Sequence, residues 1–336
     1  MIKEAIAKLI DKIDLTRVEA GQVMQEIMKG EATMAQISAY LVSMRLKGES
    51  IDEIVGSAEI MRQHAIKIMS KRPNLLDTCG TGGDRSYTFN ISTLSALVAA
   101  GAGAVVAKHG NRAVSSMCGS ADLLKELGVN IEAGPLVMQK CLNEIGIAFL
   151  FAPLLHESMK YAAPVRREIG VRTIFNMLGP ITNPAGAKHH LLGVFNVNLT
   201  EPLAKALAKL GSKHVLVVAG KDGLDEITTT CETVISELKN GKVKTYKVKP
   251  TDFGIKKAKP ADLKGRDFAF NAKLALDILN GKKGPQRDIV VLNAGAAIYA
   301  ADIVKNIKAG VKLAKESIDS RNAIQKLEAL KKATNV

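Results

Sequence analysis

DTCGTGGDRSYTFNIST, residues 77–93, combines glycines, acids, an arginine and several hydroxyl and amide side chains in one short stretch. A buried strand or helix has little use for this mixture, so we expect a loop. We predict that a short strand ends at Asp77 and that a helix begins near residues 90–93. Gly80, Gly82 and Gly83 would let backbone N–H groups approach a ligand closely.

The start of the predicted helix favours binding of an anion. Asn90, Ser92 and Thr93 supply side-chain donors where a helix dipole is positive. The stretch is not a P-loop, because no Gly-Lys-Ser/Thr follows, and Arg85 occupies the last position of a G-x-G-x-x-G motif. A phosphate site is the favoured interpretation, and a tight strand-to-helix turn is the alternative.

A second polar stretch follows the next apolar run. AVVAKHGNRAVSSMCGSADLL, residues 104–124, begins as a buried strand and continues with Lys108, His109, Asn111, Arg112, Ser115, Ser116 and Ser120. Ligands of open parallel sheets lie at the carboxyl ends of strands. We therefore interpret the two cations as part of an anion site rather than as surface charge. His109 is favoured as a hydrogen-bonding scaffold residue over a catalytic base.

A third stretch, VVAGKDGLDEITTT (217–230), carries acids after a strand that is predicted to end at Gly220. Asp225 and Glu226 are adjacent carboxylates, and Mg²⁺ prefers a few carboxylates together with water and phosphate oxygens. Asp84 and Asp222 are weaker candidates for the same ion, and a solvated acidic turn is the alternative. Together, the three stretches indicate a phosphorylated, pyrophosphate-bearing substrate.

The surrounding chain predicts an α/β protein with a small N-terminal helical domain. Capping boxes at Thr16, Thr33 and Ser50 begin helices, and Met34, Ile37, Leu41 and Met44 form one apolar stripe. Short buried strands at 104–108, 147–151, 190–195 and 214–220 then alternate with helices that open at Ser120, Pro135 and Thr200. This alternation predicts a mostly parallel central sheet flanked by helices.

We predict a helical domain over residues 1–71 and an α/β domain over residues 72–336. Residues 163–184, APVRREIGVRTIFNMLGPITNP, interrupt the alternation with a predicted helix from Arg172 to Leu178 that stops at Gly-Pro. We expect the segment 164–186 to return to the helical domain.

Composition narrows the class of protein. Of 336 residues, 47% are hydrophobic, and the uncharged run Phe89–Ala107 is too rich in small polar residues for a membrane span. The N-terminus carries acids within its apolar pattern, so we expect no signal peptide. The four cysteines have neither zinc-ligand spacing nor a disulfide framework, which favours the reducing cytoplasm.

The net charge of +14 is concentrated in one segment. Residues 239–266 hold ten Lys or Arg and two Asp, which gives +8. The segment includes an alternating run around Asn240-Gly241, which is typical of a hairpin with a type I′ turn. We interpret these lysines as a solvated hairpin face rather than a binding site.

Six stretches in the same order resemble the anthranilate phosphoribosyltransferase family over nearly the whole chain. They are GTGGD (80–84), TFNIST (88–93), KHGNRAVSS (108–116), GSADLL (119–124), APVRREIGVRTIFNMLGP (163–180) and GLDE (223–226). The resemblance implies a fold of the nucleoside phosphorylase/phosphoribosyltransferase type and a homodimer formed through the helical domains. It also implies transfer of the phosphoribosyl group of phosphoribosyl pyrophosphate to anthranilate, with release of pyrophosphate, in tryptophan biosynthesis.

The resemblance further implies roles for individual residues. Phosphoribosyl pyrophosphate would contact Gly80, Gly83, Asp84, Thr88, Asn90, Ile91, Ser92, Thr93, Lys108, His109, Gly110, Asn111, Arg112, Ala113, Val114, Ser115, Ser116 and Ser120. Anthranilate would contact Gly80, Asn111 and Arg166, whose guanidinium suits a carboxylate. Two Mg²⁺ ions per monomer would be held by Ser92, Asp225 and Glu226. No residue is assigned as a general acid or base, and we expect neither a membrane nor nucleic acid as a partner.

Arg85, Met117, Cys118 and Glu157 depart from the family pattern at positions without an assigned role. Two other functions are alternatives. A pyrimidine nucleoside phosphorylase would share the fold, but we would expect it to have an extra C-terminal domain, which we do not expect here, and a lysine-serine glycine motif, which this sequence does not contain. A non-enzymatic nucleic-acid-binding relative would suit the basic charge, but it would have little need for the acidic pair or for Arg166.

Overall fold

A computed structural model describes residues 1–84, 86–112 and 118–335 of the chain. Its centre is a seven-stranded sheet in the order β3-β2-β1-β4-β5-β6-β7. The strands are β1 (Leu75–Gly80), β2 (Val105–Gly110), β3 (Ile147–Phe151), β4 (His189–Gly193), β5 (His214–Gly220), β6 (Thr233–Lys239) and β7 (Lys242–Val248). Pairs among β3, β2, β1, β4 and β5 are parallel, while β6 and β7 add an antiparallel hairpin. The mostly parallel sheet is therefore confirmed.

Strand β1 is longer than predicted. It continues past Asp77 to Gly80, in register with β4 from His189 to Gly193. The pairing with β4 satisfies backbone groups of the glycine-containing stretch, so tertiary pairing overrides the low strand propensity of glycine. Asp77 is buried within the strand, and its carboxylate accepts hydrogen bonds from the His109 N–H (3.1 Å) and from Asn183 Nδ2 (2.7 Å).

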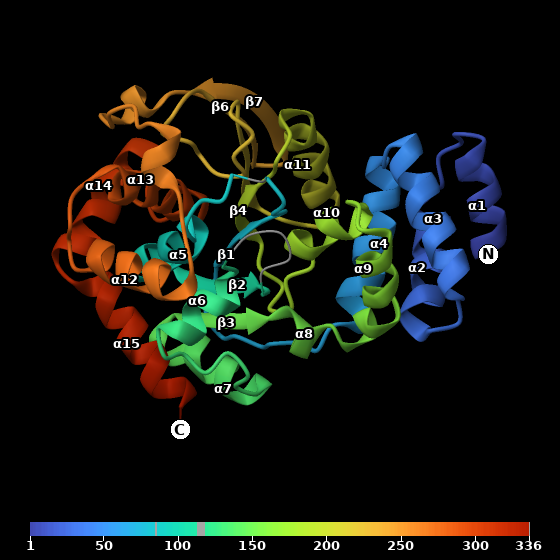
Figure 1. The fold of residues 1–336 in the computed structure, drawn as a ribbon, viewed down its shortest axis with the longest axis horizontal. Coiled ribbons are helices and arrows are strands. Elements are labelled where there is room, and N and C mark those ends of the chain that lie inside the picture. Colours follow the sequence, from blue (N-terminus) through green and yellow to red (C-terminus); the bar gives the residue numbers. More distant parts are fainter. Residues whose placement is uncertain (85, 113–117, 336) are drawn as a thin grey trace.

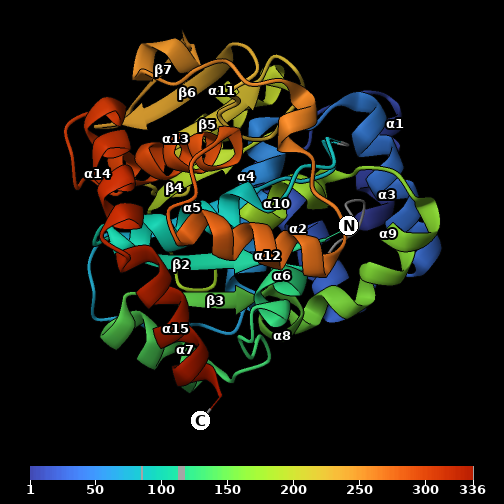
Figure 2. The same cartoon turned by 60° about the vertical axis from the view of Figure 1, so that its left-hand side comes forward.

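Helices cover both faces of the sheet (Figures 1 and 2). Alternate residues of β5 show why: Leu216 and Val218 belong to one buried cluster, and Val215 and Val217 to another. The first face is covered by α5 (Ile91–Gly101) and α13 (Pro285–Ala300), and the second by α11 (Thr200–Lys209). The helix predicted to begin near residues 90–93 is confirmed as α5, and the strand predicted at 104–108 is confirmed as β2, which runs from Val105 to Gly110.

The remaining elements of this part of the chain surround these layers. They are α6 (Ser120–Glu126), α7 (Pro135–Lys140), the π-helical turn η1 (Cys141–Ile145), the short 3₁₀ helices η3 (Val197–Leu199), η4 (Pro250–Phe253) and η5 (Pro260–Leu263), and the helices α12 (Phe268–Leu279), α14 (Ile307–Asp319) and α15 (Asn322–Thr334). None of the helices in the described part of the chain combines the length and apolar character needed to cross a bilayer.

The N-terminal helices are α1 (Ile2–Ile10), α2 (Arg17–Lys29), α3 (Met34–Lys47) and α4 (Ile51–His64). All three predicted capping boxes form at the starts of α2, α3 and α4. The predicted apolar stripe of α3 is wrong at one position. Met34 is 56% exposed because it occupies the first position of the helix, whereas Ile37, Leu41 and Met44 are buried.

A later segment returns to these helices. It comprises α8 (Ala152–Leu155), η2 (Glu157–Tyr161), α9 (Ala163–Ile169) and α10 (Ile174–Ile181). Both α9 and α10 contact α3, and Figure 1 shows α9 beside the N-terminal helices.

The predicted bounds of the helix in this segment, Arg172–Leu178, are wrong at both ends. Thr173 caps α10, so the helix starts at Ile174. It also runs through Pro180, which removes one donor but has a φ compatible with a helix. The helix ends before Asn183-Pro184, where a residue preceding proline disfavours helical geometry.

The hairpin of β6 and β7 has the predicted turn. Asn240 (φ 51°) and Gly241 (φ 74°) both lie in the left-handed region, as a type I′ turn requires. Lys242, Lys244 and Lys247 of β7 are exposed, in agreement with a solvated face.

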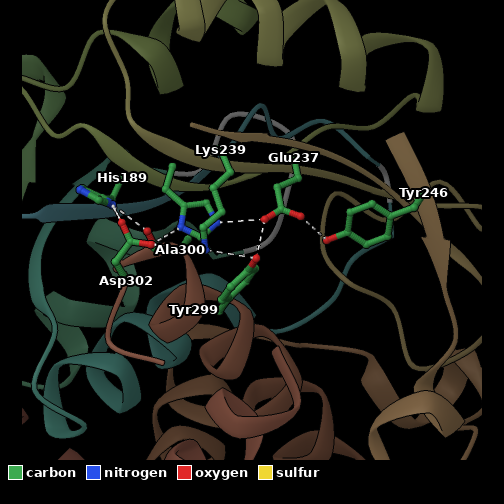
Figure 3. A network of polar contacts seen from close by, with 8 residues as sticks. His189, Glu237, Lys239, Tyr246, Tyr299, Ala300 and Asp302 are labelled. Atoms are coloured by element: carbon green, nitrogen blue, oxygen red, sulfur yellow. Dashed lines mark hydrogen bonds and ion pairs between the residues drawn. The ribbon is translucent and has the colours of Figure 1, made fainter. Parts of the chain in front are cut away.

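A polar network lies at the amino-terminal ends of the central strands β4 and β5 (Figure 3). The His214 ring bonds Asp302 Oδ1 through Nδ1 (2.6 Å) and Glu237 Oε1 through Nε2 (3.1 Å). Tyr299 and Tyr246 also donate their hydroxyls to Glu237, at 2.6 and 3.0 Å. The network ties the antiparallel hairpin to α13 and lies opposite the carboxyl ends of the parallel strands.

Candidate active site

The acidic stretch after β5 meets the glycine loop after β1. The Gly82 N–H donates to Asp225 Oδ2 at 2.9 Å. A Cβ atom at Gly80 would lie 2.6 Å from the same oxygen, and one at Gly193 would lie 1.6 Å from the Asp225 carbonyl oxygen. The two glycines therefore permit the approach, and they bring together two stretches that lie more than a hundred residues apart in the sequence.

The carboxylates at this junction crowd one another. Burial, together with the nearby charge of Asp84, raises the pKa of Asp225. Burial and then Asp225 raise the pKa of Glu226 well above its usual value. Asp84 Oδ2 is buried and has no hydrogen-bond partner among the described residues. This arrangement concentrates negative charge that a bound cation would stabilise.

Lys108 lies inside the protein rather than on its surface, with 3% of the residue exposed. Its Nζ donates to the Thr78 carbonyl oxygen at 2.6 Å and lies 3.4 Å from Ser92 Oγ. The cation thus connects β2, β1 and the first turn of α5. The predicted interpretation of Lys108 as more than surface charge agrees with this position.

The two predicted anion stretches are joined directly. Asn90, the N-cap residue of α5, donates its Nδ2 to the Cys118 carbonyl oxygen at 2.9 Å. Ser120 Oγ donates to the Asn111 carbonyl oxygen at 3.1 Å, which closes the second loop at its base. Gly110 ends β2 close to Ser120 Oγ, which would lie 2.4 Å from a Cβ atom at that glycine.

The remaining predicted substrate residues differ in burial and in the partners of their side chains. Ile91 and Thr93 are buried, and Thr93 Oγ1 has no partner among the described residues. Thr88 forms an isolated antiparallel bridge with Lys264. Arg112 is exposed and lies 3.7 Å from Asp122 and 3.5 Å from Glu132. Outside the described residues lie Arg85, Ala113, Val114, Ser115, Ser116 and Met117.

His109 is held as a neutral scaffold residue. Burial, followed by the neighbouring His156, lowers the pKa of His109 to about 3. Its Nδ1 lies 3.1 Å from the Gly179 carbonyl oxygen, and its backbone N–H donates to Asp77. The contact with Gly179 brings α10 to the end of β2, so the returning segment borders the site.

Arg166 of α9 has an environment suited to an anionic ligand. Burial lowers the pKa of its guanidinium, and its Cζ lies over the Phe175 ring, 5.3 Å from the ring centre. Within the described ranges it forms no ion pair with a carboxylate. A partly desolvated guanidinium without a counter-ion favours a bound carboxylate or phosphate.

Sequence reasoning missed Arg172 and Asn183. Arg172 Nε would lie 3.0 Å from a Cβ atom at Gly83, and its guanidinium stacks 3.7 Å from the centre of the Phe195 ring. Asn183 fixes the buried Asp77. Both residues belong to the stretch 163–184, whose basic and proline-rich character signalled an unusual segment but not these partners.

Two family models match this chain. Residues 3–65 match the helical bundle domain of the glycosyl transferase family, and residues 72–324 match the a/b domain of that family. Together with a glycine loop, a buried cation and a carboxylate pair at the strand ends, they define the class as a two-part glycosyl transferase.

Similar proteins identify one kind of enzyme within the glycosyl transferase class. An anthranilate phosphoribosyltransferase from Symbiobacterium thermophilum is 51% identical over 334 residues, which is 99% of this chain and 98% of the relative. The crystal structure of the Thermus thermophilus enzyme superposes with a TM-score of 0.94 at 44% identity, covering 99% of both chains. The Saccharomyces cerevisiae enzyme in complex with PRPP and Mg superposes with a TM-score of 0.90 at 26% identity, covering 99% of this chain and 98% of that one.

The chain belongs to the anthranilate phosphoribosyltransferase family, and its activity is transfer of a phosphoribosyl group to anthranilate in tryptophan biosynthesis. The fold and function predicted from the sequence are thereby confirmed. Neither alternative function, pyrimidine nucleoside phosphorylase or non-enzymatic nucleic-acid binding, is needed to explain the site.

Proposed function

We propose that phosphoribosyl pyrophosphate binds where the glycine loop, the buried Lys108 and the Asp225–Glu226 pair meet. The observation that carries this assignment is the hydrogen bond from the Gly82 N–H to Asp225, which joins the anion loop to the acidic pair. Hydrogen bonds from Asn90, Lys108 and Ser120 further hold the two loops to each other and to β1. The predicted donor-site residues are Gly80, Gly83, Asp84, Thr88, Asn90, Ile91, Ser92, Thr93, the stretch 108–116 and Ser120.

The residues at this site fit Mg²⁺. Asp84 Oδ2 has no partner among the described residues, and burial raises the pKa of Asp225 and of Glu226 although Arg172 and Lys108 oppose these shifts, so the carboxylates are not fully compensated. The described residues contain no group of three or more His, Cys, Asp or Glu able to hold a metal alone. Mg²⁺ commonly takes one or two carboxylates plus phosphate oxygens and water, so this sparse set suits it. We propose two ions, held by Ser92, Asp225, Glu226 and the substrate, which would neutralise charge on the leaving pyrophosphate.

The protein itself contributes orientation and donors rather than covalent chemistry. Backbone N–H groups of the glycine loop and the first turn of α5 face developing negative charge on the pyrophosphate. The returning segment would hold anthranilate near C1 of the ribose, where proximity lowers the barrier. No side chain is assigned as a general base, and the neutral His109 serves to dock α10.

The acceptor site is proposed at Gly80, Asn111 and Arg166. The support is the partly buried guanidinium of Arg166, which pairs with no acid in the described part of the chain. A bidentate contact with the anthranilate carboxylate would replace the water lost on burial.

We also propose that the protein forms a homodimer and that it functions in the cytoplasm. We further propose that residues 1–71 and 72–336 form its two domains. Large apolar side chains are exposed on the helical part, with Leu46 79% and Met34 56% exposed. Such side chains suit burial against a second copy. The four cysteines, all among the described residues, form no disulfide bond, in keeping with a reducing compartment. Light scattering should give twice the chain mass, and a monomeric mass at micromolar concentration would refute the dimer.

The test follows the loss of anthranilate fluorescence with phosphoribosyl pyrophosphate and Mg²⁺, with EDTA as a control. Arg166→Ala should raise the KM for anthranilate by roughly 10- to 100-fold, as expected for a charge-assisted hydrogen bond. Arg167→Ala is the matched control, because this exposed neighbour has no role in the proposal.

Glu226→Gln should lower kcat/KM for phosphoribosyl pyrophosphate on the order of 100-fold. It should also raise the Mg²⁺ concentration required for activity. Wild-type kinetics in the Glu226 variant would refute the metal assignment, and equal effects of the two arginine variants would refute the acceptor site.

A further inference from the structure

Residues 263–267, from the last residue of η5 to the N-cap of α12, lie alongside residues 86–89 of the first substrate loop. The Gly265 N–H donates to the Tyr87 carbonyl oxygen at 2.8 Å, and the Phe89 N–H donates to the Leu263 carbonyl oxygen at 3.4 Å. Thr88 and Lys264 form an antiparallel bridge between these bonds. The loop is therefore paired, backbone to backbone, with a stretch that lies up to 178 residues further along the chain.

The pairing holds an unusual conformation in place. Tyr87 has φ 51°, in the left-handed region that side-chain-bearing residues rarely adopt. Lys264 Nζ donates to the Ser86 carbonyl oxygen at 2.8 Å and lies 5.6 Å from the centre of the Tyr87 ring. A strained residue persists only where its surroundings determine its geometry, and here they are supplied by residues 264 and 265.

The 263–267 segment is itself rigidly held. Asn271 is 3% exposed, and its side chain bonds both the N–H and the carbonyl oxygen of Arg266. Gln286 Nε2 of α13 donates to the Asp262 carbonyl oxygen at 2.7 Å. Leu263 is buried in the main core. Because α12 and α13 fix both ends of the segment, it acts on the loop as part of the framework.

Gly265 has no room for a side chain. A Cβ atom there would lie 2.9 Å from the Phe89 nitrogen and 3.0 Å from both Phe89 Cα and the Thr88 carbonyl carbon. All three contacts are backbone atoms, which cannot rotate away. Any side chain at position 265 must therefore push the loop or the segment aside.

We infer that the 263–267 segment is a positioning element for the donor substrate, with Gly265 and Lys264 as its positioning residues. It sets the path of residues 86–89 into Asn90, the N-cap of α5, and Asn90 in turn bonds Cys118 at the second substrate loop. This inference rests on the proposed function, which places phosphoribosyl pyrophosphate against these loops. The segment lies outside the set of residues predicted to contact either substrate.

The test measures KM for each substrate, kcat and the urea midpoint of unfolding in Gly265→Ala and Lys264→Met. Gly265→Ala should raise the KM for phosphoribosyl pyrophosphate about tenfold, because small displacements of positioned groups are costly. The KM for anthranilate and the urea midpoint should stay near wild type. Lys264→Met should raise the same KM about threefold, and Lys264→Arg should restore it in part, because a cationic donor is again available.

Matched controls are Gly134→Ala, where a Cβ atom meets nothing within 4 Å, and Lys257→Met, at an exposed lysine of the same basic segment. Gly265→Ala kinetics equal to those of Gly134→Ala would overturn the inference. A lower urea midpoint with equal changes in both KM values would also overturn it, since that pattern indicates a purely structural role.

Asn90→Ala separates this inference from the function on which it rests. If Asn90→Ala raises the KM for phosphoribosyl pyrophosphate but Gly265→Ala and Lys264→Met do not, the positioning role alone is refuted. If Asn90→Ala leaves that KM unchanged, the proposed donor site itself is wrong, and the inference fails with it.

Discussion

Lys108 is a buried cation close to two buried acids. Burial raises the pKa of Asp77 to about 6 and also raises that of Glu226, while the charge of Lys108 opposes both shifts. Removing one member of a buried charged group leaves the others uncompensated, which commonly costs about 3–5 kcal/mol. At the scale of a residue, Lys108 therefore stabilises the fold and the site together.

We predict that Lys108→Met lowers the free energy of unfolding by about 3 kcal/mol near pH 8. The loss should be smaller near pH 5.5. An acid whose folded-state pKa is raised takes up a proton as pH falls through that pKa, and the protonated Asp77 no longer needs a cation. Urea titrations at both pH values measure this, with the exposed Lys125→Met as control. A loss that is the same at both pH values would contradict the explanation.

Glu237 in the network of Figure 3 should govern part of the acid stability. Burial alone would raise its pKa, but hydrogen bonds from His214, Tyr299 and Tyr246 outweigh it and lower the pKa to about 2. A lowered folded-state pKa contributes stability that is complete above the unfolded value of 4.5 and is lost as pH falls towards 2.

We predict that wild-type protein loses up to about 2 kcal/mol through this group between pH 5 and pH 3. Glu237→Gln should be less stable at pH 5 but should show a correspondingly shallower loss on acidification. Urea midpoints at the two pH values measure the slope. Glu328→Gln, at an exposed ion pair of α15, serves as control, and an unchanged slope in Glu237→Gln would refute the prediction.

At the scale of elements, α2 and α4 cross at a pair of glycines. A Cβ atom at Gly56 would lie 2.1 Å from the Arg17 carbonyl oxygen, whereas one at Gly21 would lie 3.5 Å from the Gly56 carbonyl oxygen. The first contact is impossible without moving a backbone, and the second is an ordinary van der Waals contact. The close approach of the two helices therefore requires a glycine at position 56 but not at position 21.

We predict that Gly56→Ala destabilises the protein by roughly 1–3 kcal/mol through overpacking. Gly21→Ala should be neutral or stabilising by up to about 1 kcal/mol, because alanine favours a helix over glycine. Urea unfolding of both variants measures the difference. Equal midpoints would show that the helices separate at little cost.

The helices and strands also show which sequence patterns predict structure correctly. Capping boxes and alternating apolar runs are local features, and the predicted starts of α2, α3 and α4 and the strands β3 and β5 are confirmed. The end of β1 and the passage of α10 through Pro180 were predicted wrongly. Both depend on partners distant in the sequence, β4 for the first and the packing of α10 on α3 and α4 for the second.

At the scale of the whole molecule, the β7 part of the basic segment lies away from the proposed site, whereas Lys264 near its end contacts the first substrate loop. Strand β7 is at the sheet edge, four strands from β1. At about 4.8 Å per strand the separation is roughly 19 Å, more than twice the Debye length of about 8 Å at physiological salt. Charge on β7 should therefore act weakly on a substrate at β1.

We predict that replacing Lys242, Lys244, Lys247 and Lys249 with Gln together changes kcat/KM for phosphoribosyl pyrophosphate by less than about threefold at about 0.15 M salt. Steady-state kinetics at about 0.05 and 0.15 M salt measure this. A tenfold loss that disappears at high salt would assign the lysines to substrate capture. Tight, salt-sensitive binding of DNA by the wild type that is lost in this variant would instead revive the nucleic-acid interpretation.

The sequence by itself determined the α/β class, the capped N-terminal helices, the glycine loop and the collinear motifs from which the family was recognised. These are features of neighbouring residues, whose propensities and spacing act locally. Tertiary structure alone decided which distant groups meet: Asp225 with the Gly82 N–H, Asn183 with Asp77, and Gly265 with Tyr87. The physical reason is that burial and close backbone contact are properties of the packed chain, and no local pattern encodes the partner that satisfies a buried polar group.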